Sequence, residues 1–179
     1  MDETLLRRLS DLLHDREVID TAIEQITSVP GGDERTIQWV ASEIFDIELD
    51  LSRPSTGLVG TFQSGRLSGH TVEVRSQRTC CDVLDTKGSI TCEYCMVLAG
   101  PRRHDLPTSI RAPWNIDSVY LFEMQQVHRE RGASLAPEPT VDALQWRAAE
   151  IYPSARNSIL LVNPVQAAQL QLFLTAPRS

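Results

Sequence analysis

Lysine is almost absent from this sequence of 179 residues, since Lys87 is the only one and every other basic side chain is an arginine. Acidic residues outnumber basic ones by 24 to 17, which gives a net charge of -7 at pH 7. A dedicated nucleic-acid-binding protein usually carries a basic excess, because phosphate contacts dominate its affinity. The charge balance therefore disfavours strong nucleic-acid binding and favours interaction with other proteins.

Long apolar runs are also missing, because no segment approaches the roughly 18 residues that a membrane-spanning helix needs. The N-terminal segment is amphipathic and acidic, and it lacks the basic start and apolar stretch of a secretory signal. A glycine-rich phosphate loop and a nucleophile elbow are absent as well. We therefore expect a cytoplasmic protein with no membrane segment and no motif for a P-loop nucleotide site or a serine hydrolase.

The spacing of apolar residues predicts a single domain over 1–179, with an N-terminal helical segment over 1–30 and a core over 33–179. The first helix is expected over 3–27, with a break near Asp15. Strands are expected at 59–63, 70–77, 90–99 and 116–124, and further helices at 33–46, 125–131, 141–152 and after Asn163. A turn at 85–88 would join the second and third strands as a hairpin. This order predicts an α/β fold with a mixed central sheet flanked by helices.

Glu73 and Arg75 are the sharpest candidates for chemistry. They are two residues apart in the strand expected at 70–77, so both side chains project from one face. A carboxylate there can hold Mg²⁺ or Mn²⁺, and a cation beside it can stabilise the charge that develops on a phosphate during cleavage. The alternative is an exposed ion pair on a solvated strand face.

Five segments of the chain carry a resemblance. They are GRLSGHTVEVR at 65–75, IFDIEL at 44–49, LAGP at 98–101, APW at 112–114 and AEIYP at 149–153. These segments resemble a family of uncharacterised bacterial proteins over most of the chain after Thr36. The layout of that family is similar to the PD-(D/E)xK restriction-endonuclease-like superfamily. The resemblance implies a restriction-endonuclease-like α/β core and a metal-dependent phosphodiesterase site.

The chain departs from the family pattern at the positions that matter for catalysis. Gln38 stands where the resemblance implies a helix glutamate, and Val59 stands where it implies an acidic residue before the key strand. Arg75 replaces the family lysine, and Ser76 and Gln77 replace an aromatic pair. Valine cannot bind a metal, and arginine stays charged and cannot act as a base. The resemblance thus implies a nuclease fold whose catalysis is impaired.

Four cysteines lie close together in the sequence: Cys80, Cys81, Cys92 and Cys95. The CxxC spacing of the last two suggests a zinc site. In the expected hairpin, however, Cys81 and Cys92 would share one face and Cys80 and Cys95 the other, which gives two thiol pairs and no tetrahedral site. Buried thiols that pack as small hydrophobes, and a redox pair of Cys81 with Cys92, remain as alternatives.

A basic loop over 100–114 is the one local concentration of positive charge. Arg102, Arg103 and Arg111 can bind phosphate through their guanidinium groups, and Trp114 can stack on a base. The alternative is a solvated loop that Trp114 anchors to the core.

Three functions therefore stand side by side. The first is a catalytically impaired nuclease fold that acts as a nucleic-acid-associated or protein-interaction module. The second is an active Mg²⁺- or Mn²⁺-dependent nuclease that uses Glu73 with Asp46 or Glu48 as ligands and Arg75 for charge stabilisation. The third is a small interaction or regulatory protein whose cysteine cluster holds zinc.

Overall fold

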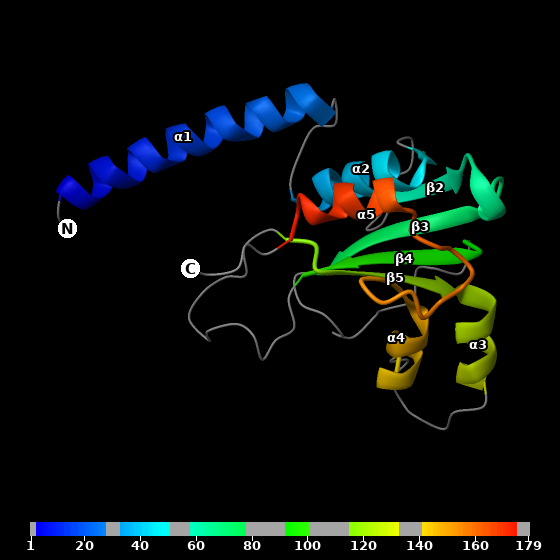
Figure 1. Cartoon of the computed structure of the whole chain (residues 1–179). Coiled ribbons are helices and arrows are strands. Elements are labelled where there is room, and N and C mark those ends of the chain that lie inside the picture. Colours follow the sequence, from blue (N-terminus) through cyan, green and yellow to red (C-terminus); the bar gives the residue numbers. More distant parts are fainter. Residues whose placement is uncertain are drawn as a thin grey trace.

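The computed structural model describes residues 3–27, 33–50, 58–77, 92–100, 115–132 and 141–174 (Figure 1). In chain order, the helices and strands are α1 (Glu3–Thr27), α2 (Asp33–Phe45), β1 (Ile47–Leu49), β2 (Leu58–Phe62), β3 (Thr71–Gln77), β4 (Tyr94–Ala99), β5 (Ser118–Glu123), α3 (Met124–Gly132), α4 (Ala143–Ala149), β6 (Glu150–Tyr152) and α5 (Pro164–Gln171). A short 3-10 helix at Gly65–Leu67 lies between β2 and β3.

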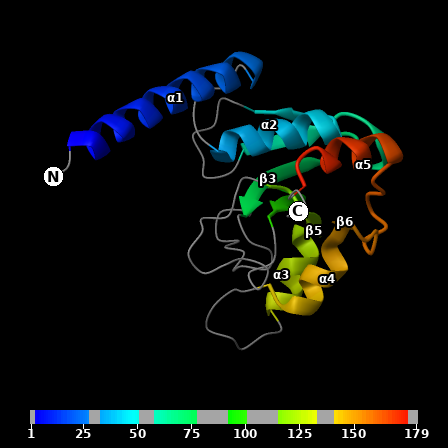
Figure 2. The ribbon, with the colours of Figure 1, turned by 60° about the vertical axis from the view of Figure 1, so that its left-hand side comes forward.

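The six strands form one mixed sheet in which the spatial order follows the chain order from β1 to β6. Strands β3 and β4 are parallel, and all the other neighbours are antiparallel. Helices α2 and α5 cover one face of the sheet, while α3 and α4 lie against the other (Figures 1 and 2). The expected α/β class, a mixed central sheet with flanking helices, is confirmed.

The larger core lies between the sheet and helices α2 and α5. Ile37, Val40, Ala41 and Ile44 form the buried stripe of α2, and they pack among the side chains of β3 and β4 that face them. The spacing of this stripe is the helical spacing on which the sequence prediction rests. The smaller core, on the other face, groups Trp146 of α4 with Tyr120 and Phe122 of β5 in edge-to-face contacts.

Helix α1 runs from Glu3 to Thr27 without interruption, so the break expected near Asp15 is wrong. Arg16 donates to Asp20 one turn later at 3.3 Å, which is the pairing that an unbroken helix allows. The consecutive charged residues Asp15, Arg16 and Glu17 interrupt the apolar spacing, so the sequence suggests a helix break where the helix is continuous. The helix lies apart from the sheet in both views and contacts the rest of the protein through α2 (Figures 1 and 2).

The hairpin expected between the second and third strands is wrong, because β3 and β4 are parallel, with Glu73 beside Cys95. A parallel pair cannot be closed by a tight turn and needs a crossover of about a dozen residues or more. Residues 78–91, which hold Cys80, Cys81 and the turn signal at 85–88, lie outside the described residues. Local turn chemistry is misleading here, since the parallel pairing is set by contacts distant in sequence.

The helix expected over 141–152 is confirmed for Ala143–Ala149, and the expectation is wrong for its last three residues. Asp142 and Gln145 form a capping box that starts α4, and the helix ends at Ala149. From Glu150 the backbone is extended, and this residue begins the three-residue strand β6, which pairs with β5. A strand of three residues leaves no alternation that a sequence can display. The expected start of α5 is confirmed, with Asn163 as its cap and Pro164 in its first turn.

Strand β1 has no counterpart among the expected strands, because it too is only three residues long. Asp46 follows α2 with a φ of 54° and turns the chain directly into β1. Gly60 of β2 lies opposite, where an added Cβ atom would stand 2.5 Å from Ile47 Cγ2 and 2.7 Å from the carbonyl oxygen of Glu48. Glycine is therefore required for β1 to approach β2 this closely.

Within the described residues, no helix has both the length and the apolar character that crossing a membrane requires.

Candidate functional site

Strand β3 divides its side chains between two different environments. Val72 and Val74 point toward α2 and are fully buried in the larger core. Glu73, Arg75 and Gln77 alternate with them and therefore face the other side of the sheet. The expectation that Glu73 and Arg75 share one strand face thus agrees with the structure. The expectation of an exposed surface pair does not, because Glu73 is buried.

The two side chains form a tight ion pair. The Nε and Nη2 atoms of Arg75 lie 2.9 Å and 2.8 Å from the same atom, Oε1 of Glu73. The side chains of Glu73 and Arg75 are only 7% and 16% exposed. Such a charge-assisted contact, shielded from water, holds the carboxylate in one orientation. The guanidinium group of Arg75 therefore occupies Oε1 of Glu73, and this oxygen would need a free lone pair to bind a metal ion.

The second oxygen of the same carboxylate is different. Oε2 of Glu73 is buried and has no hydrogen-bond partner in the structure, and the same holds for Oε1 of Gln77 farther along the face. A buried acceptor without a partner costs about 1–3 kcal/mol, so it normally marks a strained or functional position or the place of a bound water or ion. Oε2 is therefore the oxygen of this carboxylate that the ion pair leaves without a hydrogen bond.

The neighbours of Glu73 across the sheet are apolar or weakly polar. Val59 of β2 lies opposite it on one side and Cys95 of β4 on the other. Beyond Val59, the backbone amide of Asp50 donates to the Val59 carbonyl at 2.7 Å, which places Asp50 in the same row. Two strand spacings separate the Cα atoms of Asp50 and Glu73, or roughly 10 Å. The sequence prediction missed Asp50, because only the register of β1 reveals that it lies in this row.

Asp46 and Glu48 lie farther from Glu73 along the sheet. Glu48 pairs with Thr61, which pairs in turn with Thr71, so it lies two strands away from Glu73 and two rows removed. Asp46 precedes β1, is exposed, and receives a hydrogen bond from the amide of Gln63 on its carbonyl. The structure brings Glu73 and Arg75 together and leaves the other two carboxylates apart. Among the described residues, no group of three or more His, Cys, Asp or Glu side chains is arranged to hold a metal.

Gln38, the position at which the family resemblance implies a glutamate, is buried in α2. Its Nε2 atom donates to the backbone carbonyl of Val74 at 3.1 Å. It reaches β3 from the helix side of the sheet, while the side chain of Glu73 leaves β3 on the opposite side. The amide of Gln38 therefore ties α2 to the sheet, and a carboxylate at this position would lose that donor.

Cys92 and Cys95 are both buried, and Cys95 is a free thiol. Burial raises the pKa of the Cys95 thiol to about 12, and the neighbouring Arg75 offsets this only in part. At neutral pH the thiol therefore stays protonated, which makes it a poor nucleophile and a poor metal ligand. This state favours the packing role among the alternatives for Cys95. The complete zinc and redox hypotheses involve Cys80 and Cys81, which lie outside the described residues.

A second polar cluster fastens the starts of β3 and β4. The Glu93 carboxylate accepts the backbone amide of Thr71 at 2.9 Å and lies 2.9 Å from Nδ1 of His70. The hydrogen bond from Thr71 is the main reason why the pKa of Glu93 falls below its ordinary value, and His70 adds to it. This cluster is not predictable from the sequence, because it depends on the parallel register that brings residues 71 and 93 together.

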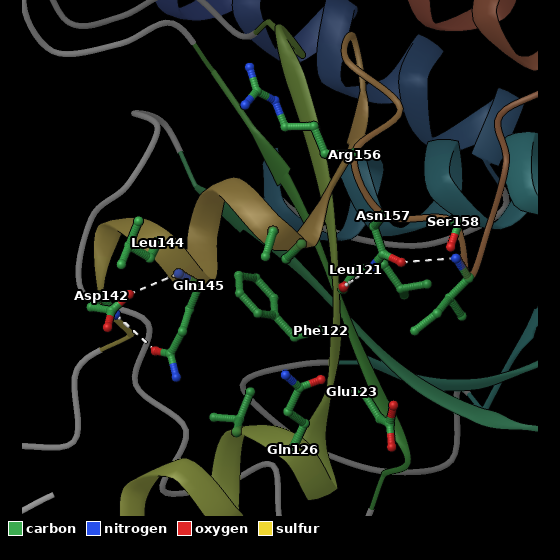
Figure 3. A pocket seen from close by; sticks show the side chains of 14 residues that line it. Leu121, Phe122, Glu123, Gln126, Asp142, Leu144, Gln145, Arg156, Asn157 and Ser158 are labelled. Carbon is green, nitrogen blue, oxygen red and sulfur yellow. Dashed lines mark hydrogen bonds between the residues drawn. The ribbon is translucent and has the colours of Figure 1, made fainter.

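A pocket of about 530 Å³ opens between β5, α3, α4 and the segment after β6 (Figure 3). Its lining includes Phe122, Glu123, Gln126 and Asp142, and it does not include Glu73. Two carboxylates in the lining repel an anion such as phosphate. Arg156, the one cation among the described lining residues, lies 3.3 Å from the buried carboxylate of Glu150. The four candidates for nucleic-acid contact, Arg102, Arg103, Arg111 and Trp114, lie outside the described residues.

The surroundings of Glu73 define what this site can do. One carboxylate oxygen is held by Arg75, the other is buried without a hydrogen bond, and the flanking positions in the sheet are Val59 and Cys95. Such a site can bind a cation or a water weakly through a single carboxylate oxygen. The chain matches no family model, no curated protein and no solved structure in the three comparisons with known proteins.

Proposed function

We propose that this chain is a cytoplasmic protein with a restriction-endonuclease-like core whose catalysis is impaired, and that it acts by binding a partner. The observation that carries the proposal is the state of Glu73. Its carboxylate is buried, forms an ion pair with Arg75, and is flanked by Val59 and Cys95. A two-metal or one-metal phosphodiesterase needs several oxygen ligands around the ion, and the described neighbours of Glu73 in its sheet row supply none directly beside it.

The charge of the chain supports a protein partner over a strong nucleic-acid complex. The net charge is -7, and the lining of the pocket beside β5 includes Glu123 and Asp142. An acidic surface repels phosphate unless basic groups are gathered elsewhere. Nucleic acid remains the second class of partner, through the arginines of the 100–114 loop.

One observation favours an alternative, a metal-dependent nuclease that is still active. Oε2 of Glu73 is buried without a partner, and Asp50 lies in the same row of the sheet on the far side of Val59. In this alternative Mg²⁺ or Mn²⁺ binds at Oε2, with Asp50 as the second carboxylate in place of Asp46 or Glu48. Arg75 then stabilises the charge on the phosphate.

Cleavage assays separate the two proposals. Single- and double-stranded DNA are incubated with Mn²⁺ and with the natural protein or Glu73→Gln, which keeps the size of the side chain and removes its charge. The impaired fold predicts no cleavage above buffer for either protein. Cleavage by the natural protein that disappears in Glu73→Gln establishes the active nuclease and overturns the main proposal. Equal cleavage by both proteins identifies a contaminating nuclease, which further purification removes before the comparison is repeated.

Rebuilding the site tests the fold assignment itself. Val59 and Glu73 are opposite one another on adjacent strands, where Cβ atoms lie about 5 Å apart, so Val59→Asp places two carboxylates within reach of one cation. We expect the double variant Val59→Asp/Arg75→Lys to bind Mn²⁺ at least ~10-fold more tightly than the natural protein, as measured by electron paramagnetic resonance. The matched control is Thr61→Asp/Arg75→Lys, which adds the same charge farther along β2. Equal Mn²⁺ binding by the two double variants would contradict the restriction-endonuclease-like assignment of this row.

A further inference from the structure

Helix α1 carries a repeat that the proposed function does not use. Apolar side chains recur at alternating steps of three and four residues, interrupted once by an arginine. This α1 seam consists of Leu9, Leu12, Arg16, Ile19, Ile23 and Ile26. The spacing is that of the a and d positions of a coiled coil, in which each a or d side chain packs between four residues of a facing helix.

The seam has no partner within the described part of the chain. Leu12, Ile19 and Ile26 are 57%, 58% and 69% exposed, and α1 lies apart from the sheet (Figure 1). Only the last turns meet the protein, since Ile23 is partly buried and Thr27 is buried. Large exposed apolar side chains that line up on one helix mark a surface that another element covers.

The charges of α1 argue against a membrane as the element that covers it. Six acidic residues and three arginines lie between Glu3 and Thr27, so the helix is net acidic. A helix that lies on a membrane surface usually has a polar face rich in lysine and arginine, which anionic headgroups attract. The charge pattern along the helix instead fits a second copy of the same helix that runs in the opposite direction.

All three arginines of α1 lie at or before Arg16, and the rest of the helix holds Glu17, Asp20 and Glu24 without a basic residue. A parallel pair would set the two acidic segments side by side. It would also place Arg16 against Arg16 in one a layer, and Asp15 against Asp20 at the flanking positions. An antiparallel pair sets each acidic segment against the segment that holds the arginines.

We propose that α1 pairs with α1 of a second copy of this chain as an antiparallel two-helix coiled coil. The layers then place Leu9 against Ile26, Leu12 against Ile23, and Arg16 against Ile19 of the partner helix. Each Arg16 lies next to Asp20 of the partner helix, in addition to the Asp20 that it already contacts at 3.3 Å within its own helix. Each arginine in the two central layers thus meets two carboxylates, and these charged contacts fix register and direction.

The oligomeric state of the full chain tests this proposal. Sedimentation velocity is expected to show a dimer for the natural protein. Ile19→Asp puts a carboxylate into the central apolar layers and is expected to raise the dimer dissociation constant at least ~100-fold. Val18→Asp is the matched control, because Val18 is also exposed but lies off the seam. A natural protein that sediments as a monomer, or a Val18→Asp variant that dissociates equally, overturns the proposal.

The direction of the pair is tested by cysteine cross-linking. Protein with Leu9→Cys is mixed with protein with Ile26→Cys, oxidised, and digested, and the linked peptides are identified by mass spectrometry. The antiparallel pair predicts links between positions 9 and 26. Links between position 9 and position 9 indicate a parallel pair and overturn the proposed arrangement. Binding of monomeric protein to vesicles of phosphatidylcholine and phosphatidylglycerol also overturns it. These outcomes are independent of the metal and cleavage tests, which report on β3.

Discussion

The two faces of β3 differ in what their side chains do, although the residues alternate along a single strand. On the face toward α2, Val72 and Val74 are fully buried among other apolar side chains. On the opposite face, Glu73 is almost as buried, but it is charged, bonded to Arg75 through one oxygen, and left with the other oxygen unpartnered. Burial is therefore similar on both faces, but it stabilises the fold at Val72 and Val74 and costs free energy at Glu73.

This contrast separates the parts of the strand that stabilise the fold from the part that is suited to chemistry. Burying an apolar side chain contributes stability in proportion to its area. Burying a carboxylate costs free energy unless it is paired and hydrogen-bonded. Glu73 is paired on one side only, so the strand retains a locally unfavourable group. Such groups persist where surrounding structure holds them in place, and they are the sites at which function is sought first.

The largest expected effect comes from removing one partner of the pair. Arg75→Ala leaves the Glu73 carboxylate buried and uncompensated, so we expect the free energy of unfolding to fall by about 3 kcal/mol. Urea denaturation followed by circular dichroism measures this change. Adding Glu73→Gln to Arg75→Ala is expected to recover part of the loss, because the uncompensated charge is removed. No recovery would mean that Arg75 acts mainly by packing.

A purely apolar substitution on the other face sharpens the contrast. Leu98 of β4 is 1% exposed and belongs to the larger core. We expect Leu98→Ala to lower the free energy of unfolding by about 3 kcal/mol, slightly less than or equal to Arg75→Ala, through lost burial and the cavity left behind. Leu98→Met, which conserves volume, is expected to cost less than about 1.5 kcal/mol in the same urea titration. The loss of unfolding free energy caused by Leu98→Ala should be the same with and without Glu73→Gln. A different loss in the Glu73→Gln background would show that the two faces are coupled.

Alkaline pH is expected to lower the free energy of unfolding through Cys95, which lies beside Glu73 in the sheet. Burial raises the pKa of Cys95 to about 12 from its ordinary 9.0. Well below pH 9 the thiol is protonated in both the folded and the unfolded chain, so it adds no pH dependence. Between those two values the unfolded chain loses the proton and the folded chain keeps it, so stability falls as the pH rises. From about pH 8 to about pH 10 we expect a loss of roughly 1 kcal/mol in the free energy of unfolding that Cys95→Ala does not show.

The smallest effect is expected at the exposed start of β3, where Glu93 contacts His70 and Thr71. Glu93→Gln is expected to lower the free energy of unfolding by a few tenths of a kcal/mol near neutral pH, because the cluster is largely exposed to water. The pKa of Glu93 is lowered, so its contribution is present above 4.5 and is lost as the pH falls below that value. The two proteins should therefore have equal stability in acid. A difference that persists there would assign the effect to hydrogen bonding alone.

The alternation of β3 is predictable from sequence, because period two is the strongest signal that a strand carries. Alternation alone places Glu73 and Arg75 on one face of the strand. Their burial is not predictable in this way, since the tertiary layers decide what covers a face. The same limit explains why the pairing of Glu73 with Cys95 is missed. A turn signal at 85–88 suggests a hairpin, and only long-range contacts set the parallel register.

The ends of the helices show the same division between local and distant causes. The start of α5 is predictable, because Asn163 and Pro164 cap a helix through contacts within a few residues. The end of α4 and the beginning of β6 are not, because three residues become a strand only by pairing with β5. Asp50 belongs to the same class, since its place in the row of Glu73 follows from the register of β1 and β2.

The position of α5 has a consequence for synthesis of the chain. Because the strands are ordered in space as they are in sequence, each can join the sheet as it leaves the ribosome. The α2 face, however, is completed only when α5 arrives, since Gln166 donates to the Ile44 carbonyl across 122 residues and Leu170 fills the core beside it. Until then the nascent sheet exposes an apolar surface. Ribosome-bound chains that end just after Tyr152 should therefore recruit chaperones, and chains that extend past Leu174 and clear the exit tunnel should release them.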